Sequence, residues 1–274
     1  MTVRRADFAD PASLSAAFAG ADKLLLVSTT DVGERVANHR RAIEAAREAG
    51  VSLLAYTSMT RADAASTILG VSHRETEELL RAGGVPYVLL RNSWYLENYT
   101  AQFPVYLQHG IIPGSAGKGL VSAATRADYA EAAATVLTTE GHAGAVYELG
   151  GDHAFSLADL ATALSAATGR AITYTDLPEA DHVRLLTEAG LPAELAEVLA
   201  DADRGLAAGE LFTDTGDLSR LLGRPTTTLT EATNAATANA TATANAATAN
   251  ATANANAATA NATANAAATV AAPR

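Results

Sequence analysis

The chain contains no cysteine, and this absence excludes a disulfide framework, a thiolate metal site and a cysteine nucleophile. Basic residues are also few: 19 Lys and Arg stand against 30 Asp and Glu, which gives a formal net charge of −11 at pH 7. Nucleic-acid binding needs a basic surface, so we expect no nucleic-acid partner. The sequence also lacks a long apolar run and an apolar leader. We therefore expect no membrane contact and a cytoplasmic location.

The last part of the sequence has a composition of its own. Every residue from 232 to 269 is Ala, Thr or Asn. Thr and Asn oppose helix formation, and no apolar stripe offers a packing face, so we predict a disordered tail, or a frayed helix at most, in residues 232–274. Its Asn-Ala-Thr triplets match a glycosylation acceptor, but a three-letter repeat generates that triplet by chance.

The preceding residues alternate between apolar runs and amphipathic segments. Four runs are typical of strands buried in a parallel sheet: residues 23–28, 51–58, 86–92 and 145–149. Helices are expected between the first three runs, at residues 34–49 and 72–82, and a further short helix before the first run, at residues 12–19. We predict an α/β fold with three parts, which are an incomplete Rossmann-like parallel sheet in residues 1–151, a small, mostly helical C-terminal lobe in residues 152–231, and the tail.

Polar side chains stand at the C-terminal ends of three of these strands. They are Ser28, Thr29 and Thr30, then Thr57 and Ser58, then Arg91-Asn92-Ser93-Trp94-Tyr95. Ligands of open α/β sheets bind beyond the C-terminal strand ends, so the pattern predicts a binding crevice at this edge. The alternative is that polar residues simply end the strands.

Other motifs point to chemistry less strongly. The six histidines are scattered and predict no metal site. Residues 110–119 fail the phosphate-loop pattern, and we interpret them as a mobile lid or hairpin turn. Glu75, Glu77 and Glu78 are expected to form a solvated helix face.

Six segments of the chain match segments of one known family and occur in the same order. They are Ala6-Asp7-Phe8, residues 23–28, Ala55-Tyr56-Thr57-Ser58, residues 90–99, residues 124–130 and residues 224–229. The most specific is Arg91-Asn92-Ser93-Trp94-Tyr95-Leu96-Glu97-Asn98-Tyr99. Together they resemble the NAD(P)H:quinone oxidoreductase branch of the NmrA-like, atypical short-chain dehydrogenases.

The resemblance implies hydride transfer from NADPH, or NADH, to a small-molecule quinone, without flavin or metal. By position, Ser28, Thr29 and Thr30 would line the adenosine–ribose side, and Thr57 and Ser58 the nicotinamide ribose. The nicotinamide end would be wrapped by Asn92, Ser93, Trp94, Tyr95, Glu97 and Asn98. Trp94 and Tyr95 would also shape the quinone pocket. A homodimer is compatible with the resemblance.

The sequence departs from the family pattern, and one departure is Ser93, which stands where the family usually has Gly. Two others bear directly on activity. Met1 aligns with the start of the family's third strand, so the Gly-rich first turn that holds the diphosphate is not in this sequence, and the Leu24–Leu26 strand would lie at a sheet edge. Leu69 and His73 stand where short-chain dehydrogenases have a Tyr-x-x-x-Lys pair.

His73 would relay a proton or hold the ribose, or it would be a half-exposed helical residue paired with Glu77. We take His73 and Tyr95 as the candidate catalytic residues. Because of the departures we expect reduced activity of this chain. The alternatives to an enzyme are a non-catalytic, dinucleotide-sensing regulator and an inactive remnant.

Overall fold

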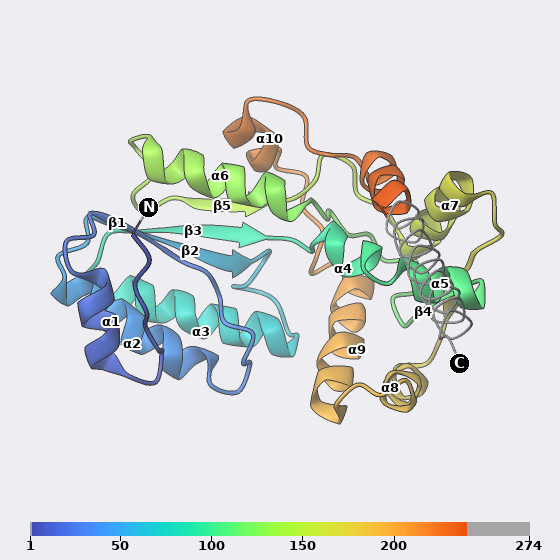
Figure 1. The fold of residues 1–274 in the computed structure, drawn as a ribbon, viewed down its shortest axis with the longest axis horizontal. Coiled ribbons are helices and arrows are strands. Elements are labelled where there is room, and N and C mark those ends of the chain that lie inside the picture. The colour runs from blue at the N-terminus through green and yellow to red at the C-terminus, as the bar shows by residue number, and fades with distance from the viewer. Residues whose placement is uncertain (1, 240–274) are drawn as a thin grey trace, which may run out of the picture.

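The computed structural model describes residues 2–239, which fold around a four-stranded parallel sheet. Its strands lie in the order β1 (Lys23–Leu26), β2 (Leu53–Met59), β3 (Tyr87–Asn92) and β5 (Val146–Leu149). One face is covered by α1 (Pro11–Phe18), α2 (Arg35–Glu48) and α3 (Ile68–Ala82), and the other by α6 (Arg126–Thr138) and α10 (Asp217–Leu222) (Figure 1). The predicted Rossmann-like parallel sheet is confirmed.

The central strand β2 shows why apolar runs form this sheet. All of its residues are buried, and successive side chains pack alternately in the hydrophobic clusters on the two faces of the sheet. Leu54 and Tyr56 pack in the cluster that contains the α2 residue Ile43, while Leu53 and Ala55 pack in the cluster with α6. A strand covered by helices on both faces needs apolar residues at nearly every position.

Strand β1 forms one edge of the sheet, as the sequence predicts. It pairs in parallel with β2, from Lys23 opposite Leu53 to Leu26 opposite Tyr56, and no other described strand pairs with it. Leu26 is buried, but Val27, the next residue, is 60% exposed.

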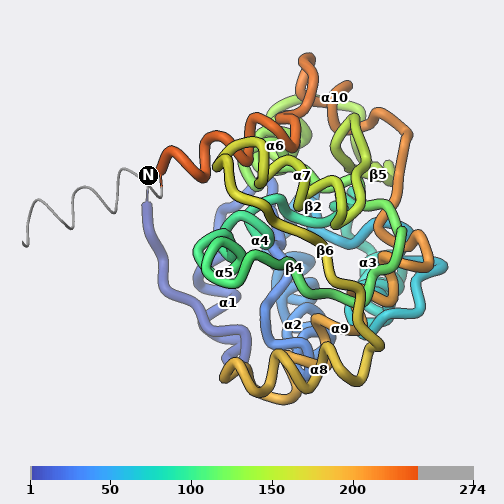
Figure 2. The backbone as a smooth tube through the Cα atoms, turned by 90° about the vertical axis from the view of Figure 1, so that its right-hand side faces the viewer, coloured from blue at the N-terminus to red at the C-terminus, as the bar shows by residue number. Residues whose placement is uncertain are grey.

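The C-terminal lobe, which in the structure also takes in residues 96–114, contains a second small sheet. Strands β4 (Ile111–Gly114) and β6 (Thr173–Asp176) pair in parallel, and Figure 2 shows the lobe from its outer end. Around them lie α4 (Leu96–Thr100), α5 (Phe103–His109), α7 (Leu157–Thr168), α8 (Glu179–Glu188) and α9 (Ala193–Ala207). The prediction of a lid or hairpin turn at residues 110–119 is therefore wrong for β4, which is a strand with a distant partner.

The beginning of the Ala/Thr/Asn repeat is ordered against this lobe. Residues 229–239 are helical. Leu229, Ala232 and Ala236 pack on the lobe's core cluster, and Thr233 is fully buried. The prediction that the repeat has no packing face is thus wrong for residues 232–239, while residues 240–274 lie outside the described part of the chain.

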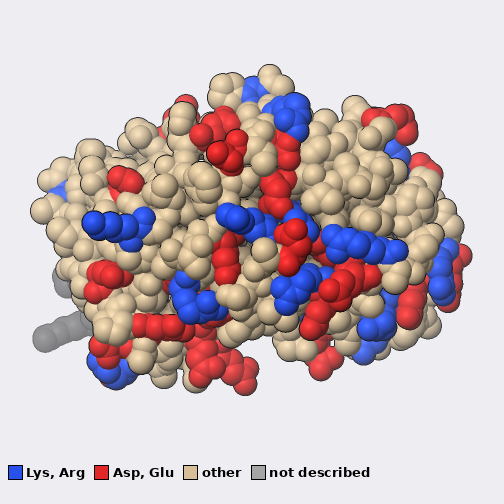
Figure 3. Space-filling view, turned by 180° about the vertical axis from the view of Figure 1, so that it is seen from behind, with Lys and Arg blue, Asp and Glu red and all other residues tan. Residues whose placement is uncertain are grey.

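The charged side chains are mixed on the face seen from behind in Figure 3, where Lys and Arg alternate with Asp and Glu. Alternating charges do not build the extended field of one sign that attracts nucleic acid. No helix in residues 2–239 is long and apolar enough to cross a membrane.

Candidate functional site

The parallel pairing of β1 with β2 and of β2 with β3 brings the predicted crevice residues to one end of the sheet. The Ser28 amide donates a 2.8 Å hydrogen bond to Thr57 Oγ1. On the neighbouring strand, Asn92 Nδ2 donates to the Tyr95 hydroxyl at 3.4 Å. All four residues thus lie at the C-terminal end of the sheet. Ser28 and Tyr95 follow β1 and β3 in the chain, while Thr57 and Asn92 are still within β2 and β3.

Two atoms in this region are buried without a partner in the described structure, Thr29 Oγ1 and Asn92 Oδ1. A buried polar atom without a hydrogen bond costs free energy, so a ligand or water molecule that supplies the missing partner is favoured there. Thr29 and Thr30 also line a hollow of about 400 Å³. Its other walls are Asp7, Phe8, Ala9, Asp31, Glu34, Asn38 and Arg41.

The aromatic pair Trp94 and Tyr95 lies where the sheet meets the C-terminal lobe. Both are half-buried. The Tyr95 ring meets the Tyr129 ring edge-on at 5.3 Å, and the Arg126 guanidinium lies 5.2 Å from the Tyr95 ring centroid. Trp94 packs on the core cluster of the lobe. These contacts hold two partly open aromatic side chains that follow Asn92 in the chain, and aromatic faces bind flat apolar molecules.

The polar atoms of four other predicted site residues form hydrogen bonds to other parts of the protein. Ser58 Oγ donates to Glu77 at 2.6 Å, and Ser93 Oγ to the Leu211 carbonyl at 2.7 Å. The Glu97 carboxylate accepts the first amide of α6, from Arg126, and Asn98 accepts from the Arg126 guanidinium. These four side chains therefore connect helices, strands and loops to one another, and their polar groups are not left open toward the crevice.

His73 is buried on α3 and pairs with an unpredicted residue. Its Nδ1 lies 2.7 Å from the Tyr56 hydroxyl, and the residue is 7% exposed. The expectation of a half-exposed histidine paired with Glu77 is therefore wrong. Burial lowers the pKa of His73 well below its usual 6.5, so the ring is neutral near pH 7. Burial also raises the pKa of Tyr56. Tyr56 lies within an apolar run, and nothing in the local sequence marks it as a polar partner.

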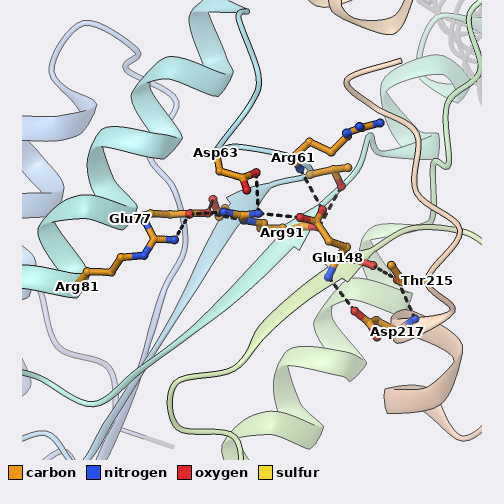
Figure 4. A network of polar contacts seen from close by, with 10 residues as sticks. Arg61, Asp63, Glu77, Arg81, Arg91, Glu148, Thr215 and Asp217 are labelled. Atoms are coloured by element: carbon orange, nitrogen blue, oxygen red, sulfur yellow. Dashed lines mark hydrogen bonds and ion pairs between the residues drawn. The ribbon is translucent and has the colours of Figure 1, made fainter. Parts of the chain in front are cut away.

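Glu77 also departs from its predicted role. It is fully buried and takes two hydrogen bonds from Arg91, at 2.8 and 2.7 Å, and one from Arg81 at 2.9 Å (Figure 4). The Arg91 guanidinium also contacts Asp63 and Glu148. This network ties the C-terminal end of β3 to α3 and β5, and so fixes the strand that carries Asn92. The prediction of a solvated face is wrong for Glu77.

In residues 2–239, no group of three His, Asp or Glu side chains is placed to hold a metal ion. The side chains at the strand ends carry hydroxyl, amide and aromatic groups. Hydroxyls and amides bind ribose and carboxamide groups by hydrogen bonds, and aromatic faces bind flat rings.

Comparison with known proteins gives consistent matches over most of the chain. The model of the NmrA-like family matches residues 1–262. Quinone oxidoreductase 2 of Escherichia coli K12 is 50% identical over 232 residues, which are 85% of this chain and 81% of that protein. The crystal structure of an NADPH-dependent quinone oxidoreductase from E. coli, complexed with NADPH, matches with a TM-score of 0.83 and 49% identity, covering 85% of this chain and 82% of the other.

More distant structures share the fold. Triphenylmethane reductase of Citrobacter sp., complexed with NADP(H), has a TM-score of 0.81 at 33% identity and covers 86% of this chain and 84% of its own. The negative transcriptional regulator NmrA, in complex with NAD, has a TM-score of 0.61 at 14% identity, with 85% and 79% covered. At that identity the likeness concerns the fold alone.

Proposed function

This chain belongs to the NmrA-like family, and we propose that it is an oxidoreductase of the quinone reductase type that transfers a hydride from NADPH to a quinone. The observation that carries the proposal is the 50% identity to a quinone oxidoreductase over 85% of the chain. Two bonded pairs at the C-terminal end of the sheet support it, Ser28 with Thr57 and Asn92 with Tyr95. NADPH, when bound, supplies the hydride, and the protein supplies position and polarity.

The residues at the strand ends fit a nicotinamide dinucleotide. Ser28, Thr29 and Thr30 would hold the adenosine–ribose part beside the hollow, and Thr57 the nicotinamide ribose. The unpaired Asn92 Oδ1 is an acceptor that suits the N–H groups of a carboxamide. The unpaired Thr29 Oγ1 can donate to, and accept from, a ribose hydroxyl. NADPH is the expected form of the cofactor, and NADH the second candidate.

Tyr95 is placed to act on the quinone. Its hydroxyl oxygen accepts the N–H of Asn92, so its own O–H stays available as a donor. A quinone oxygen gains negative charge as the carbon ring is reduced, and a donor aimed at that oxygen stabilises the charge. Trp94 would supply an apolar wall for the quinone.

His73 is neutral and bonded to the Tyr56 hydroxyl. It would hold the nicotinamide ribose or relay a proton.

The cellular location and oligomeric state are also part of the proposal. The cysteine-free composition suits a reducing compartment, and we infer a cytoplasmic location. A homodimer is compatible with the family. No observation on the crevice favours a non-catalytic regulator, because the likeness to the regulator NmrA concerns the fold alone.

The test is the rate of NADPH oxidation with and without benzoquinone, followed by NADPH absorbance. We expect oxidation that depends on both protein and quinone. Tyr95→Phe should lower kcat by about 10²–10³-fold, the loss expected when one donor to a developing negative charge is removed. Tyr87→Phe, at the opposite end of β3, is the matched control and should keep the wild-type rate. No quinone-dependent oxidation above the protein-free rate would overturn the proposal.

A further inference from the structure

The segment after β1 is held in an unusual way, by side chains of the next helix. Residues 27–30 have no regular secondary structure. Both backbone polar atoms of Thr29 are nevertheless bonded: its amide donates to His39 Nε2 at 3.2 Å, and its carbonyl accepts from Arg35 Nε and Nη2 at 3.1 and 2.9 Å. Arg35 and His39, one turn apart on α2, thus form a clamp on Thr29.

The clamp is fixed from its other side by α3. Arg35 Nη1 donates to Ser72 Oγ at 2.8 Å, and His39 Nδ1 lies 3.1 Å from Thr76 Oγ1. The Thr76 hydroxyl donates its hydrogen to the Ser72 carbonyl, so its oxygen accepts from His39. His39 then carries its hydrogen on Nδ1, which leaves Nε2 as the acceptor that the Thr29 amide needs. The ring has one tautomer that satisfies every partner.

Both clamp residues are inside the protein. His39 is fully buried and Arg35 is 5% exposed, and the His39 ring is packed edge-on against Phe8 and Tyr56. The atoms that Arg35 contacts, Thr29 O and Ser72 Oγ, carry no net charge. A buried guanidinium without a bonded carboxylate is a poor way to stabilise a fold. It does place a positive charge behind residues 27–30, where it interacts with the Asp31 carboxylate and, when bound, with a negatively charged nucleotide.

We propose that Arg35 and His39 are positioning residues for the nucleotide. They hold the backbone of Thr29 so that Thr29 and Thr30 line the hollow with hydroxyl groups, and the Thr29 hydroxyl has no partner among residues 2–239. A rigid loop binds more tightly than a mobile one because the entropy of ordering is lost before the ligand arrives. The inference rests on the proposed function, since it concerns the affinity of the same site for NADPH.

The first experiment compares two variants of one residue by NADPH titration, followed by nicotinamide fluorescence. His39→Phe keeps a ring but removes the acceptor, and should raise the Kd for NADPH about ten-fold. His39→Gln restores an acceptor and should bind within about two-fold of wild type. In the quinone assay, His39→Phe should raise the KM for NADPH and leave kcat nearly unchanged. His182→Phe, another buried histidine, is the matched control and should keep the wild-type Kd.

The second experiment measures amide hydrogen exchange of residues 28–31 in the full chain without NADPH. His39→Phe should accelerate it, and His39→Gln should not. Faster exchange with an unchanged Kd would overturn the positioning role, because the clamp would then serve stability alone. If His39→Phe does not fold, Arg35→Lys, which loses one of the two bonds to the Thr29 carbonyl, replaces it in both measurements.

The two proposals fail in different ways. If wild type binds NADPH and His39→Phe and Arg35→Lys bind equally well, the positioning role is wrong and the proposed function stands. If wild type itself does not bind NADPH, the proposed function is wrong, and the positioning role falls with it.

Discussion

The carboxylate of Glu77 on α3 is held by Arg91 on β3 through two hydrogen bonds, from Nε at 2.8 Å and from Nη2 at 2.7 Å. Neither side chain is more than 6% exposed. Asn92 follows Arg91 directly, so the pair fixes the point where β3 enters the crevice. A buried ion pair of this kind specifies one arrangement of its neighbours, and it is costly to break.

Arg91→Met should therefore destabilise the protein strongly. The substitution leaves the charge of Glu77 buried, with Arg81 as its remaining ionic partner. We expect the free energy of unfolding to fall by about 3–5 kcal/mol. Urea denaturation measures it, with Arg184→Met, which removes exposed ion pairs on α8, as the control expected to lose less than about 1 kcal/mol. Equal losses of unfolding free energy for the two variants would show that the Glu77–Arg91 pair contributes no more to stability than an exposed ion pair.

Asn92→Leu should separate stability from binding. The Asn92 Oδ1 atom is buried and unpaired, so replacing the amide by an apolar group of similar size removes a cost from the unliganded protein. We expect an unchanged or higher Tm, together with a Kd for NADPH about ten-fold weaker. Thermal unfolding and fluorescence titration measure the two effects. A lower Tm with unchanged NADPH affinity would mean that Asn92 is a structural residue.

His39 should make stability depend on pH. Burial, and then the neighbouring charge of Arg35, lower its pKa from 6.5 to about 4. The folded state binds this proton more weakly than the unfolded state, so the contribution is complete above pH 6.5 and is lost as pH falls through 4. The stability of wild type relative to His39→Gln should fall by about 3 kcal/mol between pH 7 and pH 4. A difference that does not change with pH would contradict the assignment.

Asp203 should have the opposite dependence. Burial raises its pKa to about 6, while its carboxylate accepts the Ser115 amide at 2.8 Å. The folded state binds this proton more tightly, so the stabilising effect is complete below the unfolded pKa and is lost as pH rises through 6. Asp203→Asn keeps an acceptor without a charge. It should be more stable than wild type at pH 8, by up to about 3 kcal/mol, and similar near pH 4. Thermal unfolding at both pH values checks the sign.

The strands of the main sheet were predictable because burial on two faces leaves a local signature. Residues 51–58 are apolar at most positions, and β2 indeed extends over Leu53–Met59. The crevice followed from topology, since parallel neighbours bring their C-terminal ends together. Thr57 and Asn92 could be placed there without knowing any side-chain contact.

Contacts between residues far apart in the sequence leave no comparable local pattern. Glu77 lies among other acidic residues on α3, and only the packing of α3 against β3 shows that it meets Arg91. Strand β4 contains Pro113 and Gly114, residues typical of turns, and its partner β6 is about sixty residues away. His39 looked like one of six scattered histidines until the fold placed it beside Thr29.

Equilibrium binding of NADPH to the purified full-length chain tests the central claim most directly, because every proposal on the crevice requires it. Nicotinamide fluorescence is followed as NADPH is added to wild type and to Asn92→Leu. The account predicts saturable binding to wild type and weaker binding to the variant. No saturation up to about 1 mM for wild type, at which the binding free energy would be no better than about −4 kcal/mol, would contradict it.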